Sequence, residues 1–135
     1  MDNLGFDIGY KEYSINGDES RILRINTSDM NIITRMNKAE KELQKIADKC
    51  NSTTAENAIE TLSYLDNEVR KQINYVFDGD VSDIIFGNTN CISIAGGKPI
   101  FENFLEAVFP IIKEDISTEQ KKIERKVSKY TSKVK

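Results

Sequence analysis

Hydrophobic and polar residues alternate at period two near the start of the chain, a pattern that predicts β-strands. Apolar residues at every second position from Leu4 to Ile8 share one face of such a strand. The Asn16-Gly17 pair follows, and both residues tolerate the positive φ angles that hairpin turns need. Residues 21–25 have the pattern of a return strand. We therefore expect a small antiparallel β-hairpin over about residues 4–26, with a connection of five residues beginning at Asn16.

In the next two stretches, apolar residues recur every three or four positions, which is the spacing of amphipathic helices. The first stretch predicts a helix over about residues 29–49, and Thr27, Ser28 or Asp29 can cap its start. The second predicts a helix over about residues 54–77. Because only a short link joins them, we expect the two helices to form an antiparallel helical hairpin.

Three further patterns complete the chain. A short helix is expected over about residues 81–86, and a third long helix over about 99–116, which Pro110 should kink. A basic C-terminal helix is expected over residues 119–135. Together the patterns predict a mostly helical α+β chain, in which one globular domain spans residues 1–118 and precedes the basic helix.

The Gly96-Gly97-Lys98 sequence resembles a phosphate-binding loop but lacks the residues that such a loop requires. A Walker-type loop needs a glycine five positions before the second glycine and a hydroxyl after the lysine. This chain has Ile92 and Pro99 at those positions. We therefore interpret the two glycines as a sharp turn, and Pro99 as the opening of the helix that follows. A weaker alternative is that Lys98 and the first amides of the helix bind an anion.

Composition narrows the possible chemistry further. The chain has no histidine, which excludes Ser–His and Cys–His nucleophilic sites. Its two cysteines, Cys50 and Cys91, fit free thiols. Asp78, Asp80 and Asp83 resemble part of a calcium loop, but the terminal glutamate of that loop does not follow. We expect no enzymatic activity, no cofactor and no metal.

Charge is distributed unevenly along the chain. Residues 119–135 carry seven lysines and arginines against two glutamates, whereas the whole chain has a net charge of −3. An acidic body with a basic tail indicates an interaction surface. No apolar run is long enough to span a bilayer, and the first residues lack the pattern of a signal peptide, so we expect a cytoplasmic protein.

Apolar residues at helical spacing in the basic tail form a narrow stripe typical of a helix that docks in a protein groove. The alternative is that this stripe packs on the chain's own core. Nucleic acid is not favoured, because the tail has one aromatic residue and the body is acidic. A membrane surface is not favoured either, because the stripe lacks Trp and Phe. The candidate partner-binding residues are Ile123, Val127, Tyr130 and Val134 of the tail, with Phe101 and Phe104 of the preceding helix.

Five stretches, which together extend over nearly the whole chain, carry a family resemblance: FDIGYKEYSINGDESR, INTSDMNIITRM, VRKQINYVFDGDVSDIIFG, SIAGGKPIFENFLEAVFPII and KVSKYTSKVK. In this order they resemble the small tail assembly chaperones of long-tailed phages and prophages of Gram-positive bacteria. The resemblance implies a protein that binds the tape measure protein, and contacts the tail tube protein, in the cytoplasm of the host. This binding would keep the long helical tape measure protein soluble until tube subunits polymerise around it.

Two other functions fit the same pattern. A structural component of the tail or of the head–tail junction would form a stable homo-oligomer. A small phage protein that inhibits or triggers a host defence protein would use its acidic body to mimic nucleic acid.

Overall fold

The computed structural model describes the backbone of residues 1–51 and 58–133, with the side chains of residues 1–49 and 58–122. The chain is α+β and mostly helical, as predicted, with an N-terminal antiparallel hairpin followed by helices. None of the helices in these ranges has a stretch long and apolar enough to cross a membrane. The elements are β1 Tyr10–Ile15, β2 Asp18–Asn26, α1 Asn31–Asn51, α2 Ala58–Phe77, α3 Ser82–Phe86, β3 Ile94–Ala95, β4 Lys98–Pro99 and α4 Ile100–Lys133.

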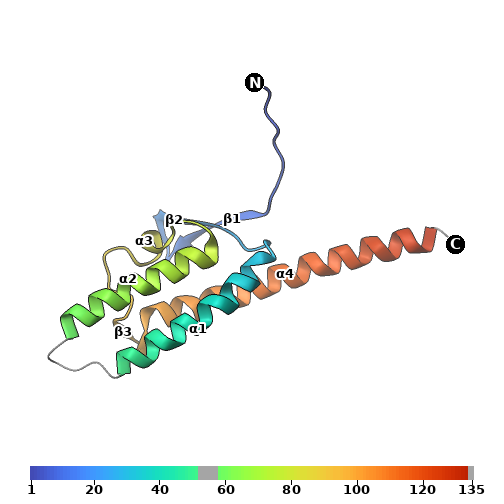
Figure 1. The fold of residues 1–135 in the computed structure, drawn as a ribbon. Helices are drawn as coiled ribbons and strands as arrows, with labels where there is room; N and C mark the ends of the chain where they lie inside the picture. The colour runs from blue at the N-terminus through green and yellow to red at the C-terminus, as the bar shows by residue number, and fades with distance from the viewer. Residues whose placement is uncertain (52–57, 134–135) are drawn as a thin grey trace.

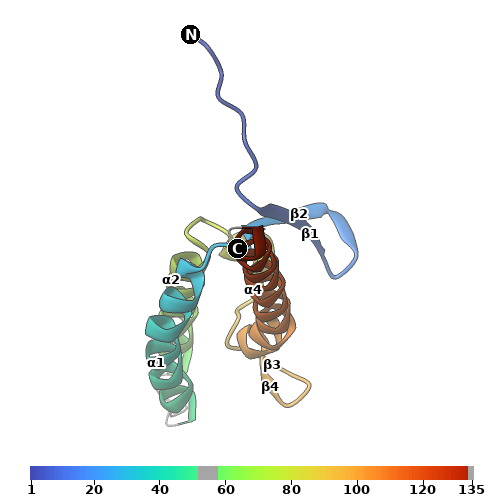
Figure 2. The same ribbon diagram turned by 90° about the vertical axis from the view of Figure 1, so that its right-hand side faces the viewer.

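The helices form two layers beside the hairpin. Helices α1 and α2 lie against each other in one layer, and α4 forms the other, with β1 and β2 across one end (Figures 1 and 2). The C-terminal half of α4 extends beyond every other element, and residues 1–9 leave the body as an extended arm (Figure 1). The body is therefore a small core from which two segments project.

The hairpin turn is tighter than predicted. Asn16 and Gly17 adopt positive φ angles of 50° and 78° and form a two-residue turn, so that Ile15 pairs directly with Asp18. The expected five-residue connection is wrong, because β2 begins at Asp18 and absorbs the additional residues in a register shift between Ser14 and Ile15.

The hairpin also starts later than predicted. Tyr10 pairs with Asn26, the last residue of β2, and the chain then turns into α1 at Asn31. Residues 4–9 alternate like a strand, but the hairpin offers them no opposite strand. The prediction that the hairpin begins at residue 4 is therefore wrong.

The boundaries of the first helices lie close to those predicted. Asp29 caps α1 by accepting a hydrogen bond of 3.0 Å from the amide of Asn31, and α1 runs to Asn51 rather than to residue 49. Helix α2 ends at Phe77, as predicted, whereas its expected start at residue 54 lies outside the described residues. The short helix α3 matches its prediction within one residue.

Helix α4 runs without a break, although two separate helices, 99–116 and 119–135, were expected. It continues through Pro110 to Lys133. Proline removes the hydrogen bond to the carbonyl four residues earlier. Pro110 is exposed, so water can reach that carbonyl, while Val108 and Ile112 on either side are buried and hold the helix against the core. No sequence signal between residues 116 and 119 ends the helix.

The core lies where α1, α2, α4 and the inner face of the hairpin meet. Ile25, Val69, Ile73 and Ile112 are fully buried there. Along β2, buried residues alternate with exposed ones, which is the period of a strand with one covered face. On the helices the buried positions follow helical spacing. This core includes all the long elements, so the body folds around one hydrophobic centre.

Arginine side chains bond the carbonyl groups at helix ends. Arg21, from the irregular part of β2, donates to the carbonyl oxygens of Ile84 and Ile85 in α3, at 2.7 and 2.5 Å. Arg35, from α1, donates to the carbonyl of Val76 near the end of α2, at 2.8 Å. These carbonyls have no partner within their own helices, so each arginine satisfies a helix terminus from another element.

Replacing Ile73 by alanine should destabilise the protein by about 2–5 kcal/mol, because the side chain is fully buried and its removal leaves a cavity. Urea unfolding followed by circular dichroism measures the loss. Ile59→Ala is the matched control on the same helix, because Ile59 is 88% exposed and its truncation should change stability by less than about 0.5 kcal/mol. Equal effects of the two substitutions would contradict this assignment of the core.

Candidate protein-binding site

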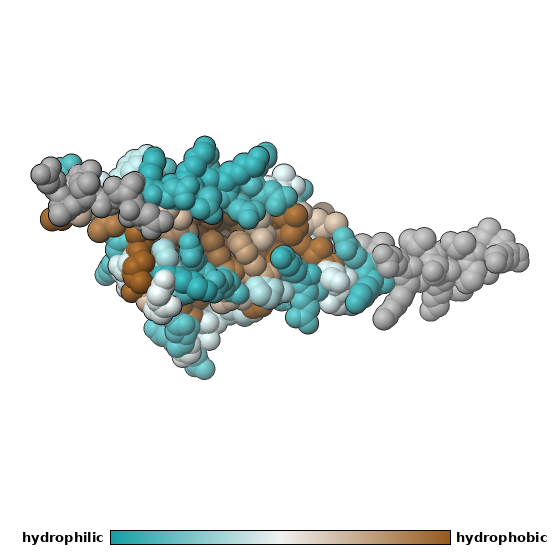
Figure 3. All heavy atoms as spheres, turned by 90° about the horizontal axis from the view of Figure 1, so that it is seen from below, coloured by the Kyte–Doolittle hydropathy of each residue, from teal (hydrophilic) through white to brown (hydrophobic). Residues whose placement is uncertain are grey.

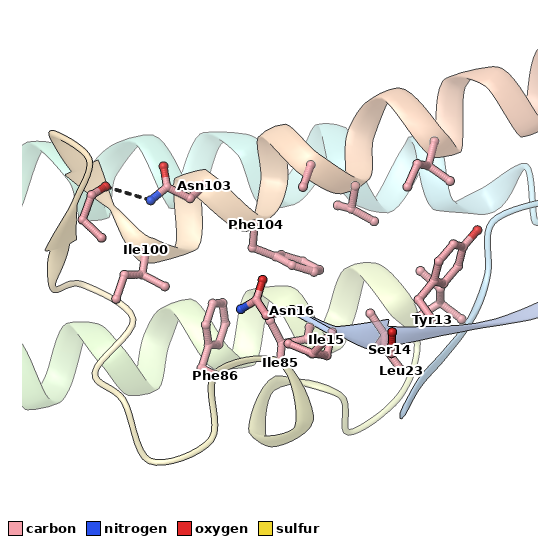
Figure 4. A pocket seen from close by; sticks show the side chains of 15 residues that line it. Tyr13, Ser14, Ile15, Asn16, Leu23, Ile85, Phe86, Ile100, Asn103 and Phe104 are labelled. Atoms are coloured by element: carbon pink, nitrogen blue, oxygen red, sulfur yellow. Dashed lines mark hydrogen bonds between the residues drawn. The ribbon is translucent and has the colours of Figure 1, made fainter. Parts of the chain in front are cut away.

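An apolar groove of about 550 Å³ lies between the β-hairpin and α4. We call it the hairpin groove. None of its lining residues carries a charge, so it favours apolar side chains over solvated ionic ones. It is lined chiefly by Tyr13 and Ile15 of β1, Ile85 of α3, and Ile100, Phe104 and Ile111 of α4 (Figure 4).

Phe104 forms the centre of this groove. Its half-buried ring projects from α4 into the groove and contacts Phe86 of α3 (Figure 4). The ring centroids of Phe104 and Phe86 are 5.9 Å apart in an edge-to-face arrangement, and Phe77 contacts Phe104 in the same way at 5.9 Å. Such aromatic pairs hold the ring in place, so the floor of the groove is preformed.

Asp115 joins the hairpin to α4 beyond the groove. Its carboxylate accepts a hydrogen bond from the hydroxyl of Thr27, which is fully buried, and pairs with the Lys11 ammonium at 2.9 Å. Burial would raise the pKa of the Asp115 carboxyl, but these two partners outweigh it and hold the pKa below its ordinary value. The charged form of Asp115 is therefore the one that ties the hairpin to α4.

A second apolar surface lies between α1 and α4. We call it the α1–α4 seam. It encloses about 170 Å³. Viewed from below, an apolar strip runs along the molecule between hydrophilic side chains (Figure 3). Glu40 and Gln44 of α1 and Glu102 of α4 line its rims. The apolar lining includes Met36, Ala39, Leu43, Phe101, Leu105 and Phe109.

The glycine loop is a β-turn, as interpreted from the sequence. Gly96 and Gly97, with φ angles of 65° and 85°, connect the two-residue strands β3 and β4. Helix α4 begins directly after Pro99. Its first amides are already bonded within the chain, because Ile100 donates to the carbonyl of Ser93 at 2.9 Å. Lys98 pairs with Glu106 at 2.5 Å, so both features of the weaker anion-binding alternative have partners within the chain.

Arg70 organises the polar groups around Cys91. It pairs with Asp66 at 3.2 Å and with Asp83 at 2.8 Å, and donates to the carbonyls of Gly87 and Thr89. Asp66 also accepts a hydrogen bond from the Cys91 amide at 2.8 Å. Burial would raise the pKa of Asp66, but these donors hold it below its ordinary value. This cluster anchors the segment after α3 to α2.

The buried thiol of Cys91 is unsuited to catalysis. Its side chain has no exposed surface, and burial raises the pKa of the thiol far above its ordinary value. Asp80 accepts a hydrogen bond from Asn74, and Asp83 pairs with Arg70. Among the described residues, no three acidic, histidine or cysteine side chains are grouped as metal ligands.

The structure separates the predicted partner-binding residues. Phe101 is 2% exposed and lies at the floor of the α1–α4 seam, whereas Phe104 lies in the hairpin groove. Ile123, Val127 and Tyr130 belong to α4, but their side chains, and Val134 altogether, lie outside the described residues.

Sequence reasoning named one residue of each apolar surface, Phe101 and Phe104, but predicted neither surface as a whole. The lining of each comes from segments far apart in the chain, and no local spacing connects them. The apolar face predicted for the helix over residues 99–116 was the signal that led to Phe101 and Phe104.

A family model described as "Family of unknown function (DUF6673)" matches residues 17–135. Because the match covers most of the chain, the protein belongs to this family. No curated protein and no solved structure matches the chain. The matched span begins at the hairpin turn, so it contains both α1 and α4.

Asp115→Asn should lower stability by about 1 kcal/mol at neutral pH, because it removes the charge that Lys11 and Thr27 bind. Since folding lowers the pKa of Asp115, its contribution is present above the unfolded pKa of about 4 and is lost as the pH falls through the folded value. The difference between the two proteins should therefore shrink in acid. Urea unfolding between neutral pH and about pH 3 measures it.

Glu114→Gln is the control, because Glu114 is an exposed carboxylate one residue earlier on α4. Its stability should stay within about 0.5 kcal/mol of the wild type. The role assigned to Asp115 would be contradicted by identical acid sensitivity in the wild type and in D115N.

Proposed function

We propose that this member of the DUF6673 family is a phage tail assembly chaperone that binds the tape measure protein and keeps it soluble until the tail tube assembles. The proposal rests on the resemblance of its sequence stretches to those chaperones and on one structural observation. That observation is the unbroken course of α4, which lines the α1–α4 seam with Phe101, Leu105 and Phe109 and then continues past the body to Lys133.

Helical spacing connects this part of α4 to the tail. Phe109, Ile112 and Ile116 are three and four residues apart and face the body, where Ile112 is fully buried and Ile116 is 8% exposed. Position 123 is seven residues further, which is nearly two turns of an α-helix. Positions 127 and 130 follow at spacings of four and three. On one uninterrupted helix these three positions lie on the same face as Phe109, Ile112 and Ile116. Two separate helices could have turned that face in different directions.

The shape and charge of the seam suit a helical client. Two helices run along its sides, and a third amphipathic helix can lie between them with its apolar stripe against Met36, Leu105 and Phe109. Its rims carry hydrophilic groups, which keep the outer surface hydrated. A long apolar stripe on the tape measure protein would otherwise aggregate, and covering it removes that surface from water.

The proposed function also requires that the chaperone leaves its client. The seam encloses about 170 Å³, and we propose that each chaperone covers a short part of the client. Tail tube protein then displaces the chaperones as the tube polymerises. We propose that this exchange takes place in the host cytoplasm and involves no catalytic step.

Co-expression with the tape measure protein from the same genome tests the proposal. The tape measure protein should become soluble and co-purify with this chain. Val127→Glu should reduce the co-purified client about tenfold or more, because a charge then enters the apolar contact. Ser128→Glu adds the same charge at the next position, about a quarter of a turn around the helix, and should retain the client.

The proposal fails if the client stays insoluble with the wild-type chain. It also fails if V127E and S128E recover equal amounts of client, because this face of α4 would then make no contact. A closed ring in solution that does not bind the tape measure protein would favour the alternative of a structural tail component. Circular dichroism of both variants controls for the loss of the helix.

A further inference from the structure

The arm formed by residues 1–9 exposes apolar side chains that the body leaves uncovered. Leu4 is 90% exposed, Phe6 is 79% exposed and Ile8 is 55% exposed. They alternate with polar or small residues, so an extended arm has one apolar and one polar face. Within the described chain, no hydrogen bond involves the backbone of residues 2–6. The arm thus resembles a β-strand without a neighbouring strand.

The base of the arm is fixed in direction. The side chain of Asn26 donates a 2.6 Å hydrogen bond to the carbonyl of Ile8, and Gly9 adopts a φ of +90°. A Cβ atom at Gly9 would lie 2.9 Å from the Cβ of Ser28, so only glycine fits this close approach. These contacts direct the arm away from its own body (Figure 1).

The hairpin groove can provide the neighbouring strand and the apolar cover that the arm lacks. Its lining is uncharged, and it includes three consecutive residues of β1, from Tyr13 to Ile15, and the turn residue Asn16. Strand β1 pairs only with β2 among the described strands, so its other edge has free backbone groups. An added strand can pair with this edge and place alternate side chains against the groove.

We propose that the arm of one copy of this chain binds the hairpin groove of a second copy. Leu4, Phe6 and Ile8 then enter the groove, while their polar neighbours face water. The chain's own groove is not the target, because the arm leaves from the Tyr10 end of β1 and points away, whereas the groove lies beside the turn end. Exchange of a terminal strand is a low-cost route to a homo-oligomer.

This contact does not depend on the proposed chaperone function. It uses the arm, β1 and the side of α4 that bears Phe104, whereas the client is proposed to bind the α1–α4 seam and the tail. Substitutions in the arm should therefore leave recovery of the tape measure protein unchanged. The two proposals can fail separately.

Phe6→Asp tests the arm in the full-length chain. Sedimentation velocity and light scattering over a range of concentrations should show wild-type self-association, which F6D weakens by about 10- to 100-fold because a buried aromatic side chain is lost from the contact. Ile59→Asp is the matched control, since Ile59 is 88% exposed on α2, away from the groove, and should associate like the wild type.

Ala107→Glu tests the groove, because Ala107 is exposed on α4 and lines the groove. It should weaken self-association to a similar extent. Ser117→Glu adds the same charge to the same helix outside the groove and should have no effect. Mixing F6D with A107E should give heterodimers, since F6D keeps an intact groove and A107E keeps an intact arm.

Three results would overturn the proposal. The first is a wild-type chain that is monomeric at every concentration, including the case in which the arm folds onto its own groove. The second is an oligomer whose mass F6D and A107E leave unchanged, which would assign the groove to another partner. The third is a mixture of the two variants that contains no heterodimer although each variant is folded by circular dichroism.

Discussion

Burial of the first half of α4 is the constraint on which the rest of the structure depends. Phe101, Val108, Ile112 and Ile116 are all nearly inaccessible to water, and they are covered from two sides. Helices α1 and α2 cover one side, and the hairpin with α3 covers the other. Because the helix continues beyond Ile116 after this cover ends, the same element is a core helix at its start and a projecting helix at its end.

Polar contacts fix the ends of the helices and the hairpin that cover α4. Arg21 and Arg35 satisfy carbonyls at the ends of α3 and α2, and Asp115 joins the end of the hairpin to α4. An apolar core alone does not specify such positions, because hydrophobic contact has no direction. Hydrogen bonds and ion pairs do have direction, so they fix the positions of the elements that border the hairpin groove and the α1–α4 seam.

The two proposed contacts use different faces of α4. A helical client would occupy the seam and continue along the tail, whereas the arm of a second copy would occupy the hairpin groove. Both contacts can therefore exist in one assembly. A chaperone that self-associates through its arms would offer several seams to one long client, which raises the overall affinity while each contact stays weak.

The sequence by itself determined the class of fold and the local elements, because hydrophobic periodicity and capping residues act over a few positions. It predicted the hairpin with its Asn16-Gly17 turn, the helical hairpin, and the glycine turn before α4. Only the tertiary structure decided that residues 4–9 have no strand partner among the described residues, that α4 passes through Pro110, and that Phe101 is buried while Phe104 lines a groove. These outcomes depend on which surfaces distant segments cover. The periodicity of one segment marks its buried face but does not say which other segment covers that face.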